Sequence, residues 1–221
     1  MRLTIFNGSP KHGDNNTSMM INEFVQGFSE TAENEFKIFK LNALPNIAEA
    51  AKIYETSDYI LLAFPLYVYS MPAGVKEFIE ALEPMQNDGK TRKLGFLVQY
   101  GFQEAIHARP LEKYLKTLAV MLNCEYLGTI IKGGCDGLAR SPQAKQSREI
   151  LQSVHEIGAI FGKNGKFDAH AIAELAKPEI QKPTAAFIMK LIIGLINKYY
   201  WGGQLKKNGA LGQSFNKPYG R

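Results

Sequence analysis

Cysteine is scarce in this 221-residue sequence, which contains only Cys124 and Cys135 and no Cys-x-x-Cys spacing. A disulfide framework and a zinc site are therefore not expected, and no metal site is predicted. A low cysteine content is typical of proteins in a reducing compartment. We therefore predict a cytoplasmic protein. We interpret Cys135 as a small buried or loop residue rather than as a reactive thiol.

Long apolar runs are also lacking. The first run, residues 3–6, is too short for the apolar core of a signal peptide, and a polar turn follows it at once. An apolar segment near the carboxyl end is interrupted by lysines and is shorter than the roughly 20 residues that span a bilayer. We predict neither a signal peptide nor a transmembrane segment.

Two common nucleotide-binding motifs are missing. The sequence contains no G-x-x-x-x-G-K-[ST] loop, and the turn after the first apolar run is not a G-x-G-x-x-G turn. A nucleoside triphosphate loop and a dinucleotide-binding turn are therefore not expected there. No basic pattern in the main part of the chain suggests nucleic acid binding.

Short apolar runs alternate with helical patterns along the chain. Runs with β-branched or aromatic content occur at residues 3–6, 36–41, 59–64, 94–99 and 127–131. Helical spacing is found at residues 19–28, 46–54 (the weakest pattern), 75–82, 111–122 and 150–160. Nearly continuous apolar strands are typical of a parallel sheet that is covered on both faces. The alternation predicts an α/β fold with three layers and a doubly wound, five-stranded parallel sheet in the order 2-1-3-4-5.

The turn after the first strand, "NGSPKHGDNNTS", is rich in hydrogen-bond donors. In this fold class a ligand binds beyond the carboxyl ends of the strands, near the switch between strands one and three. A helix that starts near Asn15 to Thr17 would present unpaired N–H groups there, which suits a phosphate. The other interpretation is a well-capped turn whose polar side chains satisfy their own backbone. A phosphate site without a magnesium-binding context favours a monophosphate, of which flavin mononucleotide (FMN) is the commonest on this architecture.

Two loops carry a resemblance to a known family. "NGSPKHGDNNTS" after strand one and "FPLYVYSMPAGVKEFIEAL" after strand three resemble the signature loops of the flavodoxin-like NAD(P)H-dependent FMN reductase and quinone reductase family. The similarity covers roughly the first 160 residues, and the carboxyl-terminal "YWGGQLKKNGALGQSFNKPYGR" resembles the tails of some members.

The resemblance implies which residues would contact FMN. In the family the first loop binds the flavin phosphate and the second borders the isoalloxazine ring, where aromatic walls suit a flat ring. The phosphate role falls to Ser9, Lys11, Asn16, Thr17 and Ser18. The ring role falls to Pro65, Leu66, Tyr67, Val68, Tyr69 and Met71, and in the fourth-strand loop to Tyr100, Gly101 and Phe102. Tyr67 and Tyr69 could instead cap the core under a loop.

The fourth-strand loop contains two ionisable residues that could take part in the reaction. His107 could donate a hydrogen bond to a quinone or to flavin, but we interpret it as a surface histidine at a helix start. Glu104 is interpreted as a helix-capping residue rather than as a base. No side chain is predicted to be catalytic, because a bound flavin carries the chemistry.

Some features of relatives are missing. Iron–sulfur relatives need a compact run of cysteines near the second loop, which this sequence does not have. It also lacks the Thr/Ser-x-Thr-Gly-x-Thr phosphate loop and the strong acidity of the small electron-carrier flavodoxins. Both absences favour an enzyme over a protein-to-protein electron carrier.

The basic character of the chain belongs to its tail. From Lys177 to Arg221 there are eight Lys or Arg and one acid, giving +7, so the remaining residues carry −2 of the total of +5. We predict a flavodoxin-like domain over residues 1–165 and a basic, partly helical extension over residues 166–221. The apolar face predicted in the extension comprises Phe187, Ile188, Leu191, Ile192, Leu195, Ile196 and Tyr199. It could pack on its own domain or on a second subunit, which we favour, lie in a membrane interface, or close over the flavin.

The sequence therefore predicts an FMN-dependent oxidoreductase that passes electrons from NAD(P)H to a quinone, a flavin or another small acceptor. A homodimer is expected, and peripheral membrane contact through the tail is left open. One alternative is a flavin-containing electron-transfer protein that docks on a redox partner or a membrane. A weaker one is a phosphate-ligand module without redox activity.

Overall fold

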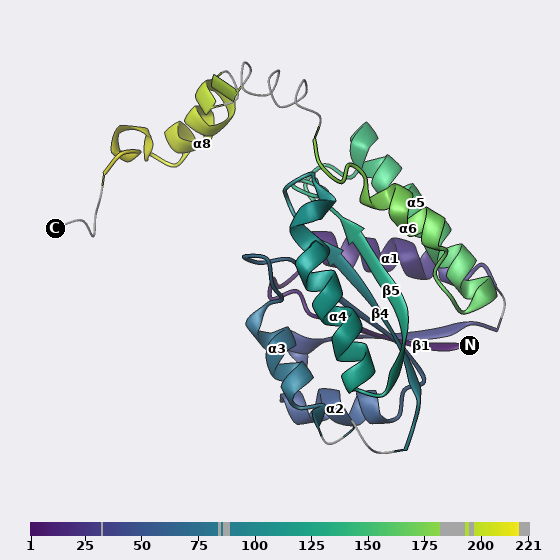
Figure 1. Ribbon diagram of the computed structural model, residues 1–221. Helices are drawn as coiled ribbons and strands as arrows, with labels where there is room; N and C mark the ends of the chain where they lie inside the picture. The colour runs from purple at the N-terminus through teal and green to yellow at the C-terminus, as the bar shows by residue number, and fades with distance from the viewer. Residues whose placement is uncertain (32, 84, 86–88, 182–192, 195–196, 217–221) are drawn as a thin grey trace. The chain divides into compact units, whose positions relative to one another are not determined.

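Five parallel strands form one sheet in the computed structural model (Figure 1). All residues are described except 32, 84, 86–88, 182–192, 195–196 and 217–221. The strands are β1 Arg2–Asn7, β2 Glu35–Lys40, β3 Tyr59–Pro65, β4 Arg92–Gln99 and β5 Cys124–Lys132. Their order across the sheet is β2-β1-β3-β4-β5, which confirms the predicted topology.

Helices cover both faces of the sheet, as the predicted three-layer fold requires (Figure 1). One face carries α2 Ile47–Glu55, α3 Ala73–Glu80 and α4 Arg109–Met121. The other carries α1 Asn16–Phe28, α5 Lys145–Asn164 and α6 Ala169–Ala176. Successive residues of a strand point to opposite faces, so Ile5 of β1 packs with α1 and α5 while Phe6 packs with α2 and α3.

Strand β2 departs from the expectation that every strand is covered on both faces. Phe36 and Ile38 are 40% and 37% exposed. Because β2 lies at the edge of the sheet, it has a neighbour on one side only, and Lys37 and Lys40 interrupt its apolar pattern. Charged edge residues of this kind oppose pairing with another strand.

Strand β5 begins earlier than predicted. The expected start was residue 127, but Cys124 and Tyr126 already pair with Arg92 and Leu94 of β4. The register then shifts, and Gly128 pairs with Gly95, so that Leu127 lies in a bulge. The bulge interrupts the period-two pattern that marks a strand in a sequence.

Helices α1 and α5 approach each other closely, which fixes the helix that follows the opening loop. A Cβ atom on Gly158 of α5 would lie 2.1 Å from the carbonyl oxygen of Phe24 in α1. A Cβ atom on Gly27 would likewise lie 2.0 Å from the carbonyl oxygen of His155. Side chains at these two positions would push the helices apart.

The first compact unit runs from Met1 to Ile180 and therefore extends past residue 165, the expected end of the domain. The reason is packing: the Phe167 ring lies over Gly95 of β4, where a Cβ atom would be 2.7 Å from the ring. Helix α6 then continues across the end of the sheet beside β5 (Figure 1).

The second unit runs from Gln181 to Arg221. Its described elements are a π-helical turn Asn197–Trp201, α8 Gly202–Lys207 and a 3₁₀ turn Leu211–Gln213, so the predicted helical extension is present. Apart from Tyr199, its predicted apolar face lies outside the described residues. Among the described residues, no helix is both long enough and apolar enough to cross a membrane.

We expect Gly158→Ala to lower the free energy of unfolding by about 1–3 kcal/mol, because the new methyl group forces α1 and α5 apart. Gly74→Ala is the matched control, since a Cβ atom at this position of α3 meets no atom within 4 Å. The control should be neutral or stabilise by up to about 1 kcal/mol. Urea denaturation of both variants checks this, and equal stability of the two would contradict the close approach.

Candidate functional site

A pocket of about 210 Å³ lies at the carboxyl ends of β1, β3 and β4. This is the position at which doubly wound sheets bind their ligands. The residues that line it come from the loops after β1, β3, β4 and β5: Ser9, Lys11, Asn15, Asn16, Pro65, Leu66, Tyr67, Gln99, Tyr100, Gly101 and Asp136.

Asn7, the last residue of β1, shapes the loop that follows. Its buried side chain accepts a hydrogen bond from the N–H of Ser9 at 3.0 Å and donates one to Oγ of Ser18 at 3.1 Å. The Ser9 hydroxyl in turn accepts from the N–H of Lys11 at 3.4 Å. The loop is thus held against the start of α1, with Ser9 and Lys11 facing the pocket.

The start of α1 leaves two backbone donors free. Asn15 caps the helix, since its Oδ1 accepts from the N–H of Ser18 at 3.0 Å, and its amide donates to the carbonyls of Lys11 and Gly13. The N–H groups of Asn16 and Thr17 have no acceptor in the part of the chain that the structure describes. Together with the partial positive charge of a helix start, they make this edge of the pocket suitable for an anion.

The side chains of Asn16 and Thr17 connect the loops to one another. Asn16 donates to the carbonyl of Cys135 at 2.8 Å and accepts from the N–H of Ala139 at 2.9 Å. The buried Thr17 hydroxyl accepts from Nε2 of Gln99 at 3.1 Å. An anion here would therefore be held by backbone N–H groups, the Ser9 hydroxyl and Lys11. The Asn16 amide is engaged by the loop after β5, and Thr17 and Ser18 do not line the pocket.

The loop after β3 forms a tight hairpin beside the pocket. The N–H groups of Tyr67 and Ser70 each bond the other's carbonyl, at 2.8 and 2.9 Å. The two residues between them, Val68 and Tyr69, have φ angles of 48° and 61°. Both φ angles are positive, as in a type I′ turn, which normally carries Asn and Gly because left-handed backbone is costly for other residues, above all a β-branched one. Strain of this kind is found mainly at functional sites.

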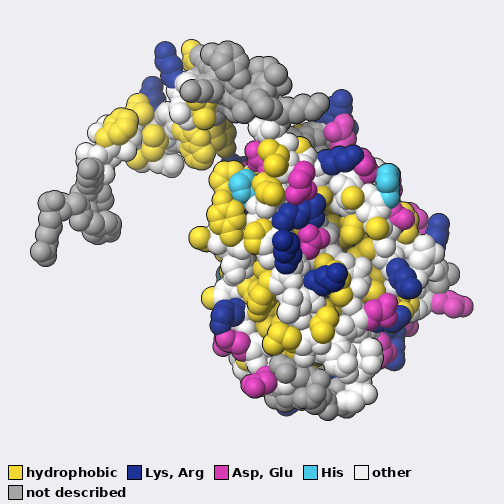
Figure 2. Space-filling view, in the orientation of Figure 1, with side chains coloured by type: hydrophobic (Ala, Val, Ile, Leu, Met, Phe, Trp, Pro, Cys, Tyr) yellow, Lys and Arg dark blue, Asp and Glu magenta, His cyan; other side chains and the backbone are white. Residues whose placement is uncertain are grey.

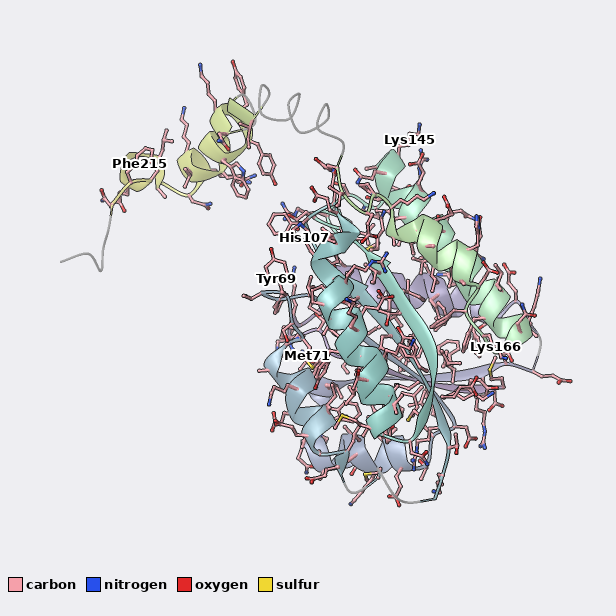
Figure 3. All side chains as sticks on the ribbon, viewed as in Figure 1. Tyr69, Met71, His107, Lys145, Lys166 and Phe215 are labelled. Atoms are coloured by element: carbon pink, nitrogen blue, oxygen red, sulfur yellow. The ribbon has the colours of Figure 1, made fainter. Side chains whose placement is uncertain are left out.

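Aromatic rings gather beside this hairpin. The His107 ring contacts those of Tyr69 and Phe102, with centroid distances of 5.6 and 5.0 Å. Figure 3 labels His107 and Tyr69. Tyr69 and Phe102 are exposed, whereas Met71 is partly buried and packs on the core. His107 lies just before α4, as predicted, and additionally makes these ring contacts. We call Tyr69, Phe102 and His107 the aromatic platform.

Glu104 occupies the N-cap position of the 3₁₀ turn Ala105–Ala108, in keeping with its interpretation as a capping residue, but its side chain makes no capping hydrogen bond. Its backbone carbonyl is used instead and accepts from the Tyr100 hydroxyl at 2.9 Å and from the N–H of His107 at 3.4 Å. Tyr100 is buried, which raises the pKa of its hydroxyl. This hydroxyl therefore stays protonated and fixes the loop.

The loop after β5 closes the remaining side of the pocket. Cys135 is buried, as interpreted from the sequence, and burial raises the pKa of its thiol to about 12, so the thiol is neutral and unreactive. The neighbouring Asp136 lies against Gly101, where a Cβ atom would be 2.9 Å from the carboxylate. Any larger residue at position 101 would displace Asp136 from the pocket lining.

The segment 177–180 forms a strap across the loop after β4. The carbonyls of Pro178 and Glu179 accept from the N–H groups of Ala105 and Ile106 at 2.9 and 3.2 Å. Arg109 donates to both oxygens of the Glu179 carboxylate, at 2.7 and 3.1 Å. Ala105 and Ile106 stand between Phe102 and His107, so the strap fixes the loop that carries much of the aromatic platform.

Lys132 holds the other end of the strap. Its ammonium group donates to the carbonyls of Leu175 and Lys177 at 3.0 and 3.1 Å, where α6 ends. Burial lowers the pKa of this lysine. A cation at a helix carboxyl end is favourable, since it faces unpaired carbonyls and the negative end of the helix dipole.

Comparison with known proteins identifies the family. The family described as "Flavodoxin-like fold" matches residues 1–156. The chain belongs to this family. No curated protein matches the chain.

Solved structures with the flavodoxin-like fold resemble the chain at low sequence identity. An NADPH-quinone reductase from P. pentosaceus is 18% identical with a TM-score of 0.52, covering 71% of this chain and 96% of that one. An azoreductase from Bacillus anthracis str. Sterne is 15% identical with a TM-score of 0.52, covering 73% and 99%. An NADH:FMN oxidoreductase in its apo form is 12% identical with a TM-score of 0.53, covering 83% and 92%. At these identities the likeness concerns the fold alone.

Within this flavodoxin-like fold, the pocket brings together many of the residues predicted from sequence, namely Ser9, Lys11, Asn16, Pro65, Leu66, Tyr67, Tyr100 and Gly101. Thr17, Ser18, Val68, Tyr69, Met71 and Phe102 lie outside its lining. Asn15, Gln99 and Asp136 also line the pocket and Asn7 organises its first loop, although none of the four was a predicted site residue. Asn7 and Gln99 end strands, a position that marks the ligand edge of a parallel sheet and could have singled them out.

Relief of strain in the hairpin turn is measurable. Val68→Asn should raise the free energy of unfolding by about 1 kcal/mol, because asparagine tolerates a positive φ and valine does not. Val120→Asn, on the exposed face of α4, is the matched control and should change it by less than about 0.5 kcal/mol. Urea denaturation compares the two, and an equal effect at both positions would argue against strain at Val68.

The ion pair that holds the strap can be tested by comparing the stability of the wild type and Glu179→Gln at different pH values. Hydrogen bonds from Arg109 hold the pKa of the Glu179 carboxyl below its ordinary value of 4.5. The ion pair therefore stabilises the folded protein above that value, and its contribution is lost as the pH falls through the lowered pKa. At neutral pH we expect the free energy of unfolding of the wild type to exceed that of Glu179→Gln by about 1 kcal/mol. The difference is no larger because the ion pair is partly exposed to solvent.

At acidic pH, below the lowered pKa of Glu179, the difference in the free energy of unfolding between the wild type and Glu179→Gln should disappear. Glu77→Gln, which removes an exposed carboxylate from α3, is the control and should show no comparable change between neutral and acidic pH. Denaturation curves at both pH values decide the matter. A Glu179→Gln difference that persists in strong acid would show that the strap does not depend on this ion pair.

Proposed function

We propose that this chain binds FMN and passes electrons from NAD(P)H to a quinone, a flavin or another small acceptor. The observation that carries the proposal is the continuity of the pocket. One end holds anion-binding donors at the start of α1, and the other is walled by Pro65, Leu66 and Tyr67. A phosphate linked to a flat ring matches these two ends. The proposal includes a cytoplasmic location and a homodimer, as the sequence predicts.

The polar end suits the phosphate of FMN. The free N–H groups of Asn16 and Thr17, the Ser9 hydroxyl and the Lys11 ammonium would hold it. Gly8 keeps this loop against the sheet, because a Cβ atom there would lie 2.2 Å from Val75 of α3. The phosphate would replace water on donors that the chain itself does not use.

The apolar end suits the ring. Pro65 and Leu66 lie at the strand end, with the N–H of Leu66 bonded to the Gln99 carbonyl at 2.9 Å, and Tyr67 adds an aromatic wall. A bound flavin would supply the exchange of a hydride with the nicotinamide. The chain's own residues orient the ring and keep water from its buried side, and none of them needs to act as an acid or a base.

The exposed aromatic platform favours a second flat molecule near the ring. Tyr69, Phe102 and His107 present ring faces and edges to solvent beside the pocket. A nicotinamide or a quinone would gain contact area on such a surface. The similar structures, a quinone reductase, an azoreductase and an NADH:FMN oxidoreductase, support the same reaction class.

Ser9→Asp tests the phosphate site. The added carboxylate repels a dianion, so we expect FMN affinity to fall by at least about tenfold, while riboflavin, which lacks the phosphate, loses less than about threefold. Ser214→Asp makes the same charge change at an exposed position outside the first unit and should alter neither affinity. Titration followed by flavin fluorescence measures the dissociation constants of FMN and of riboflavin for the wild type and both variants.

A second variant covers the case in which Ser9→Asp fails to fold. Lys11 is exposed, so Lys11→Gln should fold normally and weaken FMN a few-fold without affecting riboflavin. Equal losses of FMN and riboflavin in the folded variants would contradict the phosphate assignment. Oxidation of NAD(P)H by a quinone without any protein partner would then distinguish an enzyme from an electron carrier.

A further inference from the structure

The carboxyl-terminal unit carries charge of one sign only. Residues Gln181–Arg221 include seven Lys or Arg and no Asp or Glu. The first unit, Met1–Ile180, has the other 19 basic residues and all 21 acidic ones, a net charge of −2. Such a separation of charge favours a partner of the tail that is densely anionic.

The described part of this unit also exposes large apolar side chains. Trp201 and Phe215 are 57% and 95% exposed, and Tyr199, Tyr200 and Leu211 are exposed as well. Figure 2 shows the hydrophobic side chains of this segment gathered along one side, with its lysines mainly on the other. Figure 3 shows Phe215 projecting from the segment beyond α8. Aromatic rings of this kind are unfavourable in water unless a partner covers them.

The arrangement of lysines and aromatic residues matches the headgroup region of a bilayer. Tryptophan and tyrosine combine an apolar body with a polar edge and are enriched at that depth. Lys198 stands beside the Tyr199 ring, 5.7 Å from its centroid, and Lys206 and Lys207 end α8. Phosphate groups of anionic lipids would meet these lysines while the rings enter the apolar boundary.

We propose that residues 197–216, the longest described stretch of this unit, bind the surface of membranes that contain anionic lipid. A second copy of this chain, the partner that the sequence favoured for the tail, is a poorer one, because its first unit offers a net charge of only −2; the proposed homodimer would then form without the tail. A nucleic acid offers phosphates and stacking, but it offers no apolar interior for Leu211 and Phe215. The proposal is independent of the flavin site, because its residues all lie after Ile180.

Trp201 gives a direct signal, because it is the only tryptophan in the sequence. Vesicles of phosphatidylcholine mixed with phosphatidylglycerol should shift the tryptophan emission of the full-length protein to shorter wavelength. Lipids brominated along the acyl chain should quench it, and the protein should sediment with the vesicles. Vesicles of phosphatidylcholine alone should give none of these effects at low protein concentration, and high salt should weaken binding to the anionic ones.

Charge variants separate this surface from the rest of the molecule. Lys206→Gln with Lys207→Gln should lower the vesicle partition coefficient roughly 25-fold, about fivefold per lysine. Lys163→Gln with Lys166→Gln removes the same charge from exposed positions of the first unit and should leave partition unchanged. Phe215→Ser should weaken binding at every salt concentration, because it removes apolar contact rather than charge.

Three results would overturn the proposal. The first is an unchanged Trp201 emission with anionic vesicles. The second is equal loss of partition in both lysine pairs, since binding would then follow overall charge. The third is an emission change with a single-stranded oligonucleotide that equals or exceeds the change with vesicles at the same phosphate concentration.

Discussion

The backbone N–H groups at the start of α1 need an acceptor, and the rest of the site is arranged around that need. A helix start leaves several donors without internal partners. Here Asn15 satisfies only the N–H of Ser18, and Asn16, whose N–H has no acceptor among the described residues, lines the pocket. The loop places Ser9 and Lys11 beside them instead of covering them with a protein acceptor. The proposed anion would therefore accept hydrogen bonds from donors that have no acceptor among the described residues.

Side-chain amides connect the start of α1 to the other loops through hydrogen bonds. Asn16 connects the helix start to the loop after β5, and Gln99 connects it to the end of β4. The close crossing of α1 and α5 at Gly158 fixes the helix itself. These contacts hold the start of α1, the end of β4 and the loop after β5 together.

The topology was predictable from sequence because it follows from the alternation of apolar strands and periodic helices. That the loop after β1 lines a pocket was predictable because a donor-rich turn follows a buried strand. Details that depend on tertiary context were not: Phe36 and Ile38 of the edge strand β2 are exposed, and the bulge at Leu127 conceals the start of β5. Glu104 lies at a helix start but supplies its carbonyl rather than its carboxylate, which no local pattern reveals. The positive φ angles of Val68 and Tyr69 run against the local preference of both residues.

Those two φ angles persist because several contacts determine the turn at once. The paired hydrogen bonds between Tyr67 and Ser70 close the hairpin, and the Tyr69 ring packs against His107. The strap at Pro178 and Glu179 holds the segment just before His107 through backbone bonds and the Arg109 ion pair. A residue far along the chain therefore helps to stabilise a turn that its own sequence disfavours. This is the physical reason that the strap belongs with the first unit and with its site, rather than with the basic tail that follows it.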